Sequence, residues 1–405
     1  MYNHRGKTKV SLINPRSLIL LTLLLVFGCK SVINRQEDIR PRVLRDVPAR
    51  VLAYRLEADI NPPDLALEDS QKVESIQKDF LSRRTDDALL RTVVSPDGQR
   101  VLALYNTDQE LLSIFRIDLY NKDGQFIRNL IPPELACVFP ETVTWSPDGN
   151  FINFIARKRV MPTPTPPPLG AATPEVTPSP PTSPAPSFAQ VATFQTEQIY
   201  ICNRDGYDLK PLIAREGLIY FYFAWAPDNH AMVALACKEE EWAAREKAAK
   251  PPAGRPRLIT PDGTERLLDD SLANALPVWS PDSSKVATAF EYDVAIYDAA
   301  TDKPTHARLP LANQLLTASV AYAQKTSGKK SEGSGETAAN SSPTPQPADR
   351  ANAPASFNPI VRLEWKSPER LYFQTAYILL TSTEAITTFQ RWHVLQLSAQ
   401  AAVLR

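Results

Sequence analysis

Four aspartates recur at one position of a repeated phrase, and they are the first residues in this sequence that could do chemistry. Asp97, Asp148, Asp228 and Asp282 end the strings VSPD, WSPD, WAPD and WSPD. Side by side, four such carboxylates could form a ring suited to acid–base chemistry or to metal binding. An Asp that follows Pro in a turn more often accepts hydrogen bonds from its own backbone, and we predict that role for all four.

Large aromatic side chains open most copies of the same phrase. Trp145, Trp225 and Trp279 precede three of the turns, and Trp365 opens a degenerate fifth copy, WKSPER, which contains Pro368. Exposed indole rings could stack against sugars or other ligands. A Trp that ends a strand of a repeat more often packs against the next repeat, so we predict a structural role.

The other residue types that carry catalysis form no recognisable group in the sequence. The histidines are His4, His230, His306 and His393, which fall in different parts of the chain, and no HExxH, EF-hand or GxSxG pattern occurs. These patterns would have indicated a zinc site, a calcium site and a serine hydrolase. We therefore expect no metal, no cofactor and no catalytic residues. Carboxylates gathered from distant loops would leave no such pattern, so that alternative stays open.

Each copy of the phrase stands between two short runs of β-branched and aromatic residues, which predict strands. Pro presets one corner of the turn, and the last position, held by Gly98, Gly149, Asn229 and Ser283, favours a positive φ that suits Ser least. A second turn, such as Asp-Gly within Ile199–Ile213, follows in most units. Each unit thus has four strands, A to D. The repeated turn residues are Pro96, Asp97, Gly98, Trp145, Pro147, Asp148, Gly149, Trp225, Pro227, Asp228, Trp279, Pro281, Asp282, Trp365 and Pro368.

The spacing of the copies predicts an all-β propeller made of four-stranded antiparallel blades over residues 89–405. Pro96 and Pro147 are 51 residues apart, and the two longer intervals each contain a low-complexity insert, at 161–187 and 324–359. Five copies predict five or six blades. The segment 49–60 begins like a strand, but we expect the last unit to supply its own strands C and D up to the chain end.

The phrase WSPDG followed by an aliphatic strand, and then by Ile-Tyr and Asp-Gly, resembles the WD-like repeat of TolB-type propellers. The resemblance covers roughly 89–405 outside the inserts. It implies a propeller, usually of six blades. It is weak for function, because such blades occur in periplasmic adaptor proteins and in the non-catalytic half of prolyl-oligopeptidase-like enzymes.

The first 28 residues read as an export signal. A basic start precedes ten apolar residues, LILLTLLLVF, too few to span a bilayer. The following Val26-Phe27-Gly28-Cys29 resembles a bacterial lipobox, which implies cleavage before Cys29 and lipid on its thiol. We expect a lipoprotein held on a membrane and facing the periplasm or the cell exterior. Without residues 1–28 the net charge is about −4, which gives no basic field for nucleic acid.

Several segments are expected outside the blades. Residues 29–88 read as a tether with a short helix, in which Val73, Ile76 and Phe80 have helical spacing. The inserts 161–187 and 324–359 are Pro-rich or Gly/Ser-rich and are predicted to be extended or disordered. Helices are predicted near 238–250 and 311–322. In a meander, B–C and D–A connections lie at one face, so we expect the inserts there, opposite the tight turns.

Three cysteines remain after the lipidation site. Cys137, Cys202 and Cys237 are an odd number and form no close pair in sequence. We expect buried free thiols, while a bridge between Cys202 and Cys237 stays possible in an exported protein.

We predict a non-enzymatic, monomeric, membrane-anchored propeller of the bacterial cell envelope that binds another envelope protein or a peptide. The first alternative is a sensor that binds a glycan or small ligand. The second is a propeller enzyme with carboxylates in its central channel.

Overall fold

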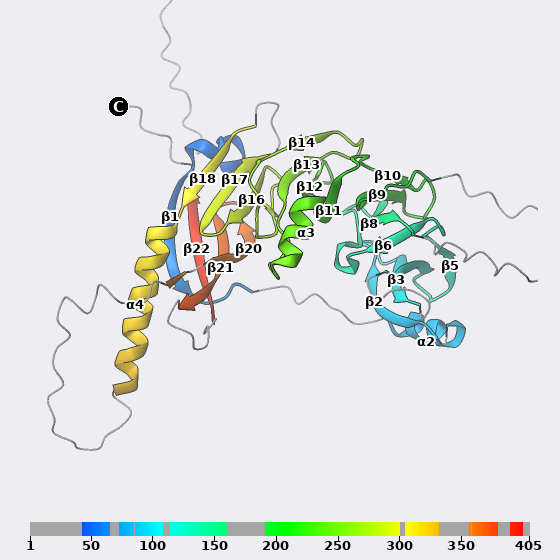
Figure 1. Ribbon diagram of the computed structural model, residues 1–405, viewed down its shortest axis with the longest axis horizontal. Coiled ribbons are helices and arrows are strands. Elements are labelled where there is room, and N and C mark those ends of the chain that lie inside the picture. Colours follow the sequence, from blue (N-terminus) through cyan, green and yellow to red (C-terminus); the bar gives the residue numbers. More distant parts are fainter. Residues whose placement is uncertain are drawn as a thin grey trace, which may run out of the picture. The chain divides into compact units, whose positions relative to one another are not determined.

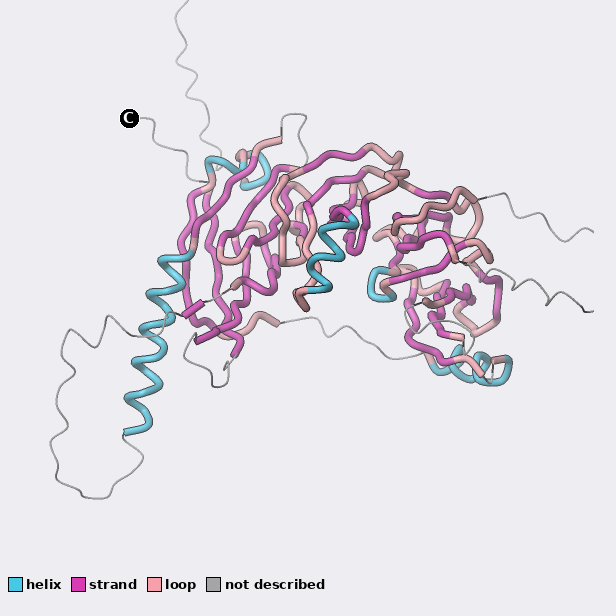
Figure 2. Tube along the Cα trace, in the orientation of Figure 1, coloured by secondary structure: helices cyan, strands magenta, loops and turns pink. Residues whose placement is uncertain are grey.

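Five antiparallel sheets form the framework of the described residues in the computed structural model, which confirms the predicted all-β propeller class (Figures 1 and 2). The structure describes residues 43–64, 73–84, 86–107, 114–160, 191–299, 304–331, 356–357, 359–379 and 389–399. The segment from Val43 to Arg405 forms one compact unit. The predicted signal peptide, Cys29 and the insert 161–187 lie outside the described residues.

The sheets follow one another along the chain and are called blades 1 to 5. Blade 1 has β2 (Ala88–Val94), β3 (Arg100–Asn106), β4 (Arg116–Asn121) and β5 (Phe126–Asn129). Blade 2 has β6 (Leu135–Val138), β7 (Thr144–Trp145), β8 (Phe151–Lys158), β9 (Gln198–Asn203) and β10 (Lys210–Pro211). Its strand A is split into β6 and β7 by the short helix η3 (Pro140–Thr142).

The remaining blades repeat the meander. Blade 3 has β11 (Leu218–Trp225), β12 (Met232–Lys238), β13 (Arg255–Ile259) and β14 (Glu265–Leu267). Blade 4 has β15 (Val278–Trp279), β16 (Lys285–Phe290), β17 (Asp293–Asp298) and β18 (His306–Pro310). Blade 5 has β19 (Ser356–Phe357), β20 (Ile360–Ser367), β21 (Arg370–Leu379), β22 (Phe389–Ser398) and β1 (Ala53–Ile60).

Apolar clusters join each blade to the next. One cluster contains Leu102 of blade 1 with Ile152 of blade 2, and another contains Val233 of blade 3 with Val286 of blade 4. Two further clusters join blade 2 to blade 3 and blade 4 to blade 5. Both faces of an inner blade are therefore apolar, which explains why strands such as β16 are buried at every position.

The N-terminal strand β1 completes blade 5, which differs from the expected arrangement. Ala53 pairs with Ser398 and Glu57 with Val394, so β1 takes the outer position D beside β22. We had expected the last unit to supply its own strand D and had assigned 29–88 to a tether. Pairing between distant segments leaves no local signal in the sequence, and the propeller therefore includes Ala53–Ile60.

The helices lie where the sequence predicts them, with one extension. The helix α2 (Glu74–Arg83) places Ile76 against blade 1, and α3 (Glu239–Lys247) follows β12. The helix α4 (Ala312–Ser331) runs eight residues into the insert predicted to be disordered, and β19 lies near the end of that insert. In the described residues, no helix is long and apolar enough to cross a membrane.

The three cysteines Cys137, Cys202 and Cys237 are buried and free of disulfides, as we had expected. Burial raises the pKa of Cys202 to about 12 and that of Cys237 to about 11. Both thiols are therefore protonated at neutral pH and unreactive.

Candidate interaction face

The repeated turns are held by one hydrogen-bond pattern. In blade 2, Asp148 Oδ1 accepts bonds from Ser146 Oγ at 2.5 Å and from the Asn150 N–H at 3.1 Å. Asp97 and Asp282 accept the equivalent bonds in blades 1 and 4. In blade 3, Asp228 keeps the bond from the backbone N–H two residues on, at His230, and the ring of His230 takes the place of the Ser hydroxyl, because Ala226 stands at the Ser position.

Each of these carboxylates accepts hydrogen bonds within its own turn, and Asp97 also accepts from Arg204 in the C–D turn of blade 2. Burial raises the pKa of Asp148, but the bonds from Ser146 and Asn150 prevail and hold that pKa below its usual range. The Ser95 hydroxyl, the Gln99 N–H and Arg204 likewise lower the pKa of Asp97. Within the part of the chain that the structure describes, no three His, Cys, Asp or Glu side chains group as metal ligands. The aspartates thus act as turn acceptors.

Two of the four tryptophans of the repeat tie one blade to the next. Trp145 Nε1 donates to the Val93 carbonyl at 3.1 Å, and Trp279 Nε1 donates to the Ala224 carbonyl at 3.0 Å. Trp145, Trp279 and Trp365 are buried, whereas Trp225 is half-buried. The buried indoles are not available as a stacking platform.

The last turn position has a second role, which the sequence analysis missed. It has a positive φ in all four turns: 68° at Gly98, 71° at Gly149, 64° at Asn229 and 59° at Ser283. Asn229 Oδ1 and Ser283 Oγ each accept the backbone N–H of the Asp in the preceding blade's turn, at 3.0 and 3.1 Å. These bonds offset the strain of a non-glycine residue at positive φ. The sequence signal for this role was the presence of Asn229 and Ser283 at a position that is Gly in the other two turns.

The strand ends define two different faces. We call the end with the A–B and C–D turns the turn face, and the end with the B–C and D–A connections the insert face. The helix α3 lies between β12 and β13, and α4 lies between β18 and β19, so both belong to the insert face. The helix α2 leads into the insert-face end of β2 (Figure 1).

The N-terminal segment is bound at the turn face of blade 4. It contains the short helices η1 (Leu44–Asp46) and η2 (Ala49–Val51). Lys285 Nζ donates to the Val47 carbonyl at 2.9 Å and to Asp298 Oδ1 at 2.8 Å, and Ala49 N–H donates to Asp298 Oδ2 at 2.8 Å. Lys285 and Asp298 are 1% and 5% exposed. A buried ion pair therefore fixes where the chain enters the propeller.

A hollow of about 610 Å³ opens on the insert-face side of blade 1. It is lined by Arg84, Asp86, Asp87, Tyr105, Thr107, Arg116, Asn129, Ile131, Pro133 and Arg159. These residues come from the segment just before β2, from the insert-face ends of β3, β4 and β5 with the connections that follow β3 and β5, and from the residue after β8. The mixture of arginines, carboxylates and one tyrosine suits a polar partner.

A buried carboxylate organises the floor of this hollow. Asp118 is fully buried and accepts from Arg84 Nη2 at 2.8 Å, Asn129 Nδ2 at 2.9 Å and Tyr105 Oη at 3.2 Å. The Arg84 guanidinium also lies 4.4 Å from the centre of the Tyr105 ring. Burial raises the pKa of Asp118, although Arg84 opposes the shift. A polar residue inside the run RIDLY was the sequence signal for this network, and we had not used it.

Comparisons with known proteins find only distant likeness. No family model and no curated protein match the sequence. Solved structures that resemble the chain include a TolB protein from Agrobacterium tumefaciens, with 16% identity and a TM-score of 0.31 over 53% of this chain and 63% of that one. An oligogalacturonate lyase in complex with manganese has 10% identity and a TM-score of 0.36 over 76% and 65%.

A third similar structure is prolyl oligopeptidase B from Galerina marginata, with 9% identity and a TM-score of 0.38 over 76% of this chain and 35% of that one. The chain spans less than two thirds of the length of each of these three proteins. The neighbours thus include TolB and other proteins with propellers, and at these TM-scores they add nothing to the functional argument.

Proposed function

We propose that this protein is a non-enzymatic, monomeric β-propeller of the bacterial cell envelope, anchored by lipid on Cys29, which binds another envelope protein or a peptide. The observation that carries the proposal is the difference between its two faces. The chain that leads from Cys29 joins the turn face at Val47 and Ala49. The helices α3 and α4 and the hollow beside Arg84 belong to the insert face.

The proposed difference in role between the turn face and the insert face has a physical basis. Hydrogen bonds between turns and indoles that donate across blades make the turn face rigid. Loops and helices carried on a rigid scaffold are where binding residues usually lie. An anchor at the turn face leaves the insert face accessible to a partner.

The anchor is tested by fractionation. We expect the wild type in the membrane fraction and the Cys29→Ser variant in the soluble extracytoplasmic fraction or uncleaved. If lipid labelling of the wild type fails, or if Cys29→Ser is lipidated equally, the anchoring proposal is wrong.

The partner-binding face is tested with photo-crosslinkers at matched exposed positions. One crosslinker replaces Glu240 on α3, and the control replaces Asp123 in the C–D turn of blade 1, whose side chain is 61% exposed. We expect reproducible crosslinks to one envelope protein from position 240 and none to that protein from position 123. Crosslinks from the turn-face position alone, or from neither position, would count against the proposal.

A further inference from the structure

The outer face of blade 5 is polar, in contrast to the faces that join blades. On one side of this sheet, Leu363, Leu371 and Phe373 belong to the apolar cluster shared with blade 4. Strand pairing places alternate residues on the other side, where Tyr372 pairs with Glu364 and Val394, and Gln396 pairs with Arg370 and Arg55. Such a face does not suit the stacking of a further blade, because charged groups would lose their hydration.

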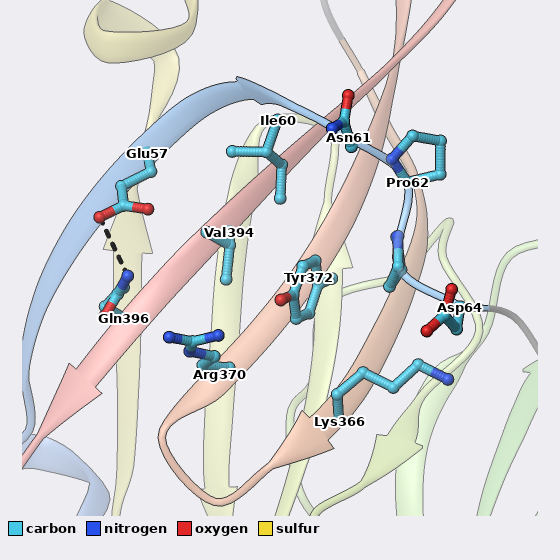
Figure 3. A pocket seen from close by; sticks show the side chains of 11 residues that line it. Glu57, Ile60, Asn61, Pro62, Asp64, Lys366, Arg370, Tyr372, Val394 and Gln396 are labelled. Carbon is cyan, nitrogen blue, oxygen red and sulfur yellow. Dashed lines mark hydrogen bonds between the residues drawn. The ribbon is translucent and has the colours of Figure 1, made fainter.

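A short strap lies over this face. After Ile60 the chain reads Asn61-Pro62-Pro63-Asp64, and two prolines without N–H groups cannot continue the ladder of β1. The chain therefore leaves the sheet. Between the strap and the strands is a hollow of about 530 Å³ (Figure 3). Its lining residues are Glu57, Ile60, Asn61, Pro62, Pro63, Asp64, Lys366, Arg370, Tyr372, Val394 and Gln396.

The hollow has four charged side chains, and two of them, Glu57 and Lys366, have partners among the described residues, whereas Asp64 and Arg370 have none there. Glu57 Oε1 accepts from Gln396 Nε2 at 2.9 Å, and Lys366 Nζ lies 3.0 Å from Glu364 Oε1. The backbone of Arg370 is part of the β21 ladder, but its side chain has neither a hydrogen bond nor an ion pair with any residue in the described ranges. Figure 3 shows its guanidinium beside the Tyr372 side chain. An arginine fork at the edge of a hollow is suited to a carboxylate.

We propose that this hollow binds a small carboxylate that also carries hydrogen-bond donors. The carboxylate pairs with Arg370, the ring of Tyr372 forms one wall, and Glu57 and Asp64 accept from hydroxyl or ammonium groups of the ligand. The volume fits the range of small-molecule sites. Sugar acids and amino acids both have this chemistry. The site is separate from the insert face and goes beyond the proposed scaffold function.

The test uses the full-length protein purified in detergent and titrated with glucuronate, glutamate and glucose by calorimetry. We expect saturable binding of glucuronate or glutamate and none of glucose, which lacks the carboxylate. Which of the two binds decides whether the donors are hydroxyls or an ammonium. If neither binds at millimolar concentration, the proposal is overturned.

Two variants test whether binding depends on Arg370 itself or only on the total positive charge of this sheet. Arg370→Gln should weaken binding about tenfold or more, since a charge-assisted pair is lost. Arg362→Gln is the matched control. Arg362 lies in β20 of the same sheet, is ion-paired with Glu364 at 3.7 Å and does not line the hollow. Equal weakening in both variants would overturn the assignment of Arg370. Thermal unfolding of both variants verifies that they are folded. If the hollow binds no carboxylate, the proposal of a partner-binding insert face is not affected, because the crosslinking experiment tests it separately.

Discussion

The two ends of the blade series are finished in different ways. At blade 1, the helix α2 covers the sheet with Ile76 and Phe80, both fully buried, and Phe80 lies 5.2 Å from Tyr105 between ring centroids. At blade 5, the distant strand β1 completes the sheet, and the outer face stays polar. A repeat unit cannot bury its last face by itself, so each end needs its own device. The cover of blade 1 is a helix that directly precedes it in sequence and packs through apolar side chains. Blade 5 is completed by a strand from the other end of the chain, and its outer face is polar.

The largest effect should come from removing the apolar contact at the first end. Phe80→Ala should lower the free energy of unfolding by about 4 kcal/mol, because a buried ring is lost and a cavity remains. Chemical denaturation measures this change. The neighbouring Leu81, 56% exposed, is the control, and Leu81→Ala should have little effect. Similar losses in both variants would contradict the role of α2 as a cover.

The next effect concerns the segment that leads into β1. Asp298→Ala should cost about 3 kcal/mol, because Lys285 would remain buried without its ion pair. Asp293→Ala, in the same strand, removes only the exposed pair with Arg308 and should cost less than about 1 kcal/mol. The comparison would fail if limited proteolysis found residues 43–52 equally protected in both variants.

A pH dependence should distinguish the polar end from the apolar one. His393 is buried, accepts from the Asp59 N–H at 3.3 Å and lies 2.9 Å from Thr375 Oγ1. Burial, reinforced by Arg391 and opposed by Asp59, lowers its pKa to about 4 from an ordinary value of 6.5. The unfolded chain therefore binds the proton more readily, and stability present above pH 6.5 is lost as pH falls towards 4.

By pH 5 the loss due to His393 should be about 2 kcal/mol. Denaturation of the wild type and of His393→Gln at pH 7 and pH 5 measures it as the difference between their pH slopes. The Phe80→Ala variant serves as the reference for the other end and should keep the wild-type slope. An unchanged slope in His393→Gln would show that this histidine does not titrate in that range.

The smallest expected change in the free energy of unfolding concerns the interface between blades 2 and 3. This interface is internal to the blade series and can be compared with both ends. Asn153 is fully buried, and neither atom of its carboxamide has a hydrogen-bond partner among the described residues. The equivalent residue of blade 3 is Val233, which belongs to an apolar cluster. Asn153→Val should raise the free energy of unfolding by about 1 kcal/mol, measured by denaturation. Destabilisation would indicate that the carboxamide has a partner, such as an internal water.

Much of the fold follows from local signals in the sequence. The phrase at Trp145 and Trp279 predicts the A–B turns, and the spacing of its copies predicts separate four-stranded units. The helical spacing of Ile76 and Phe80 predicts α2. Less of the candidate sites could be predicted. Tyr105 and Asp118 lie on the neighbouring strands β3 and β4, and Arg84, at the end of α2 and 34 residues before Asp118, meets them only through the packing of blade 1.

The sequence by itself determined the repeat, its turns and the position of the inserts, because turn chemistry and apolar alternation act over a few residues. Only the tertiary structure decided how the series ends. The pairing of β1 with β22, the burial of Lys285 beside Val47 and the polar face under the strap all join segments more than 200 residues apart. Such contacts depend on which surfaces remain unburied after the blades have stacked, and no short stretch of sequence records that.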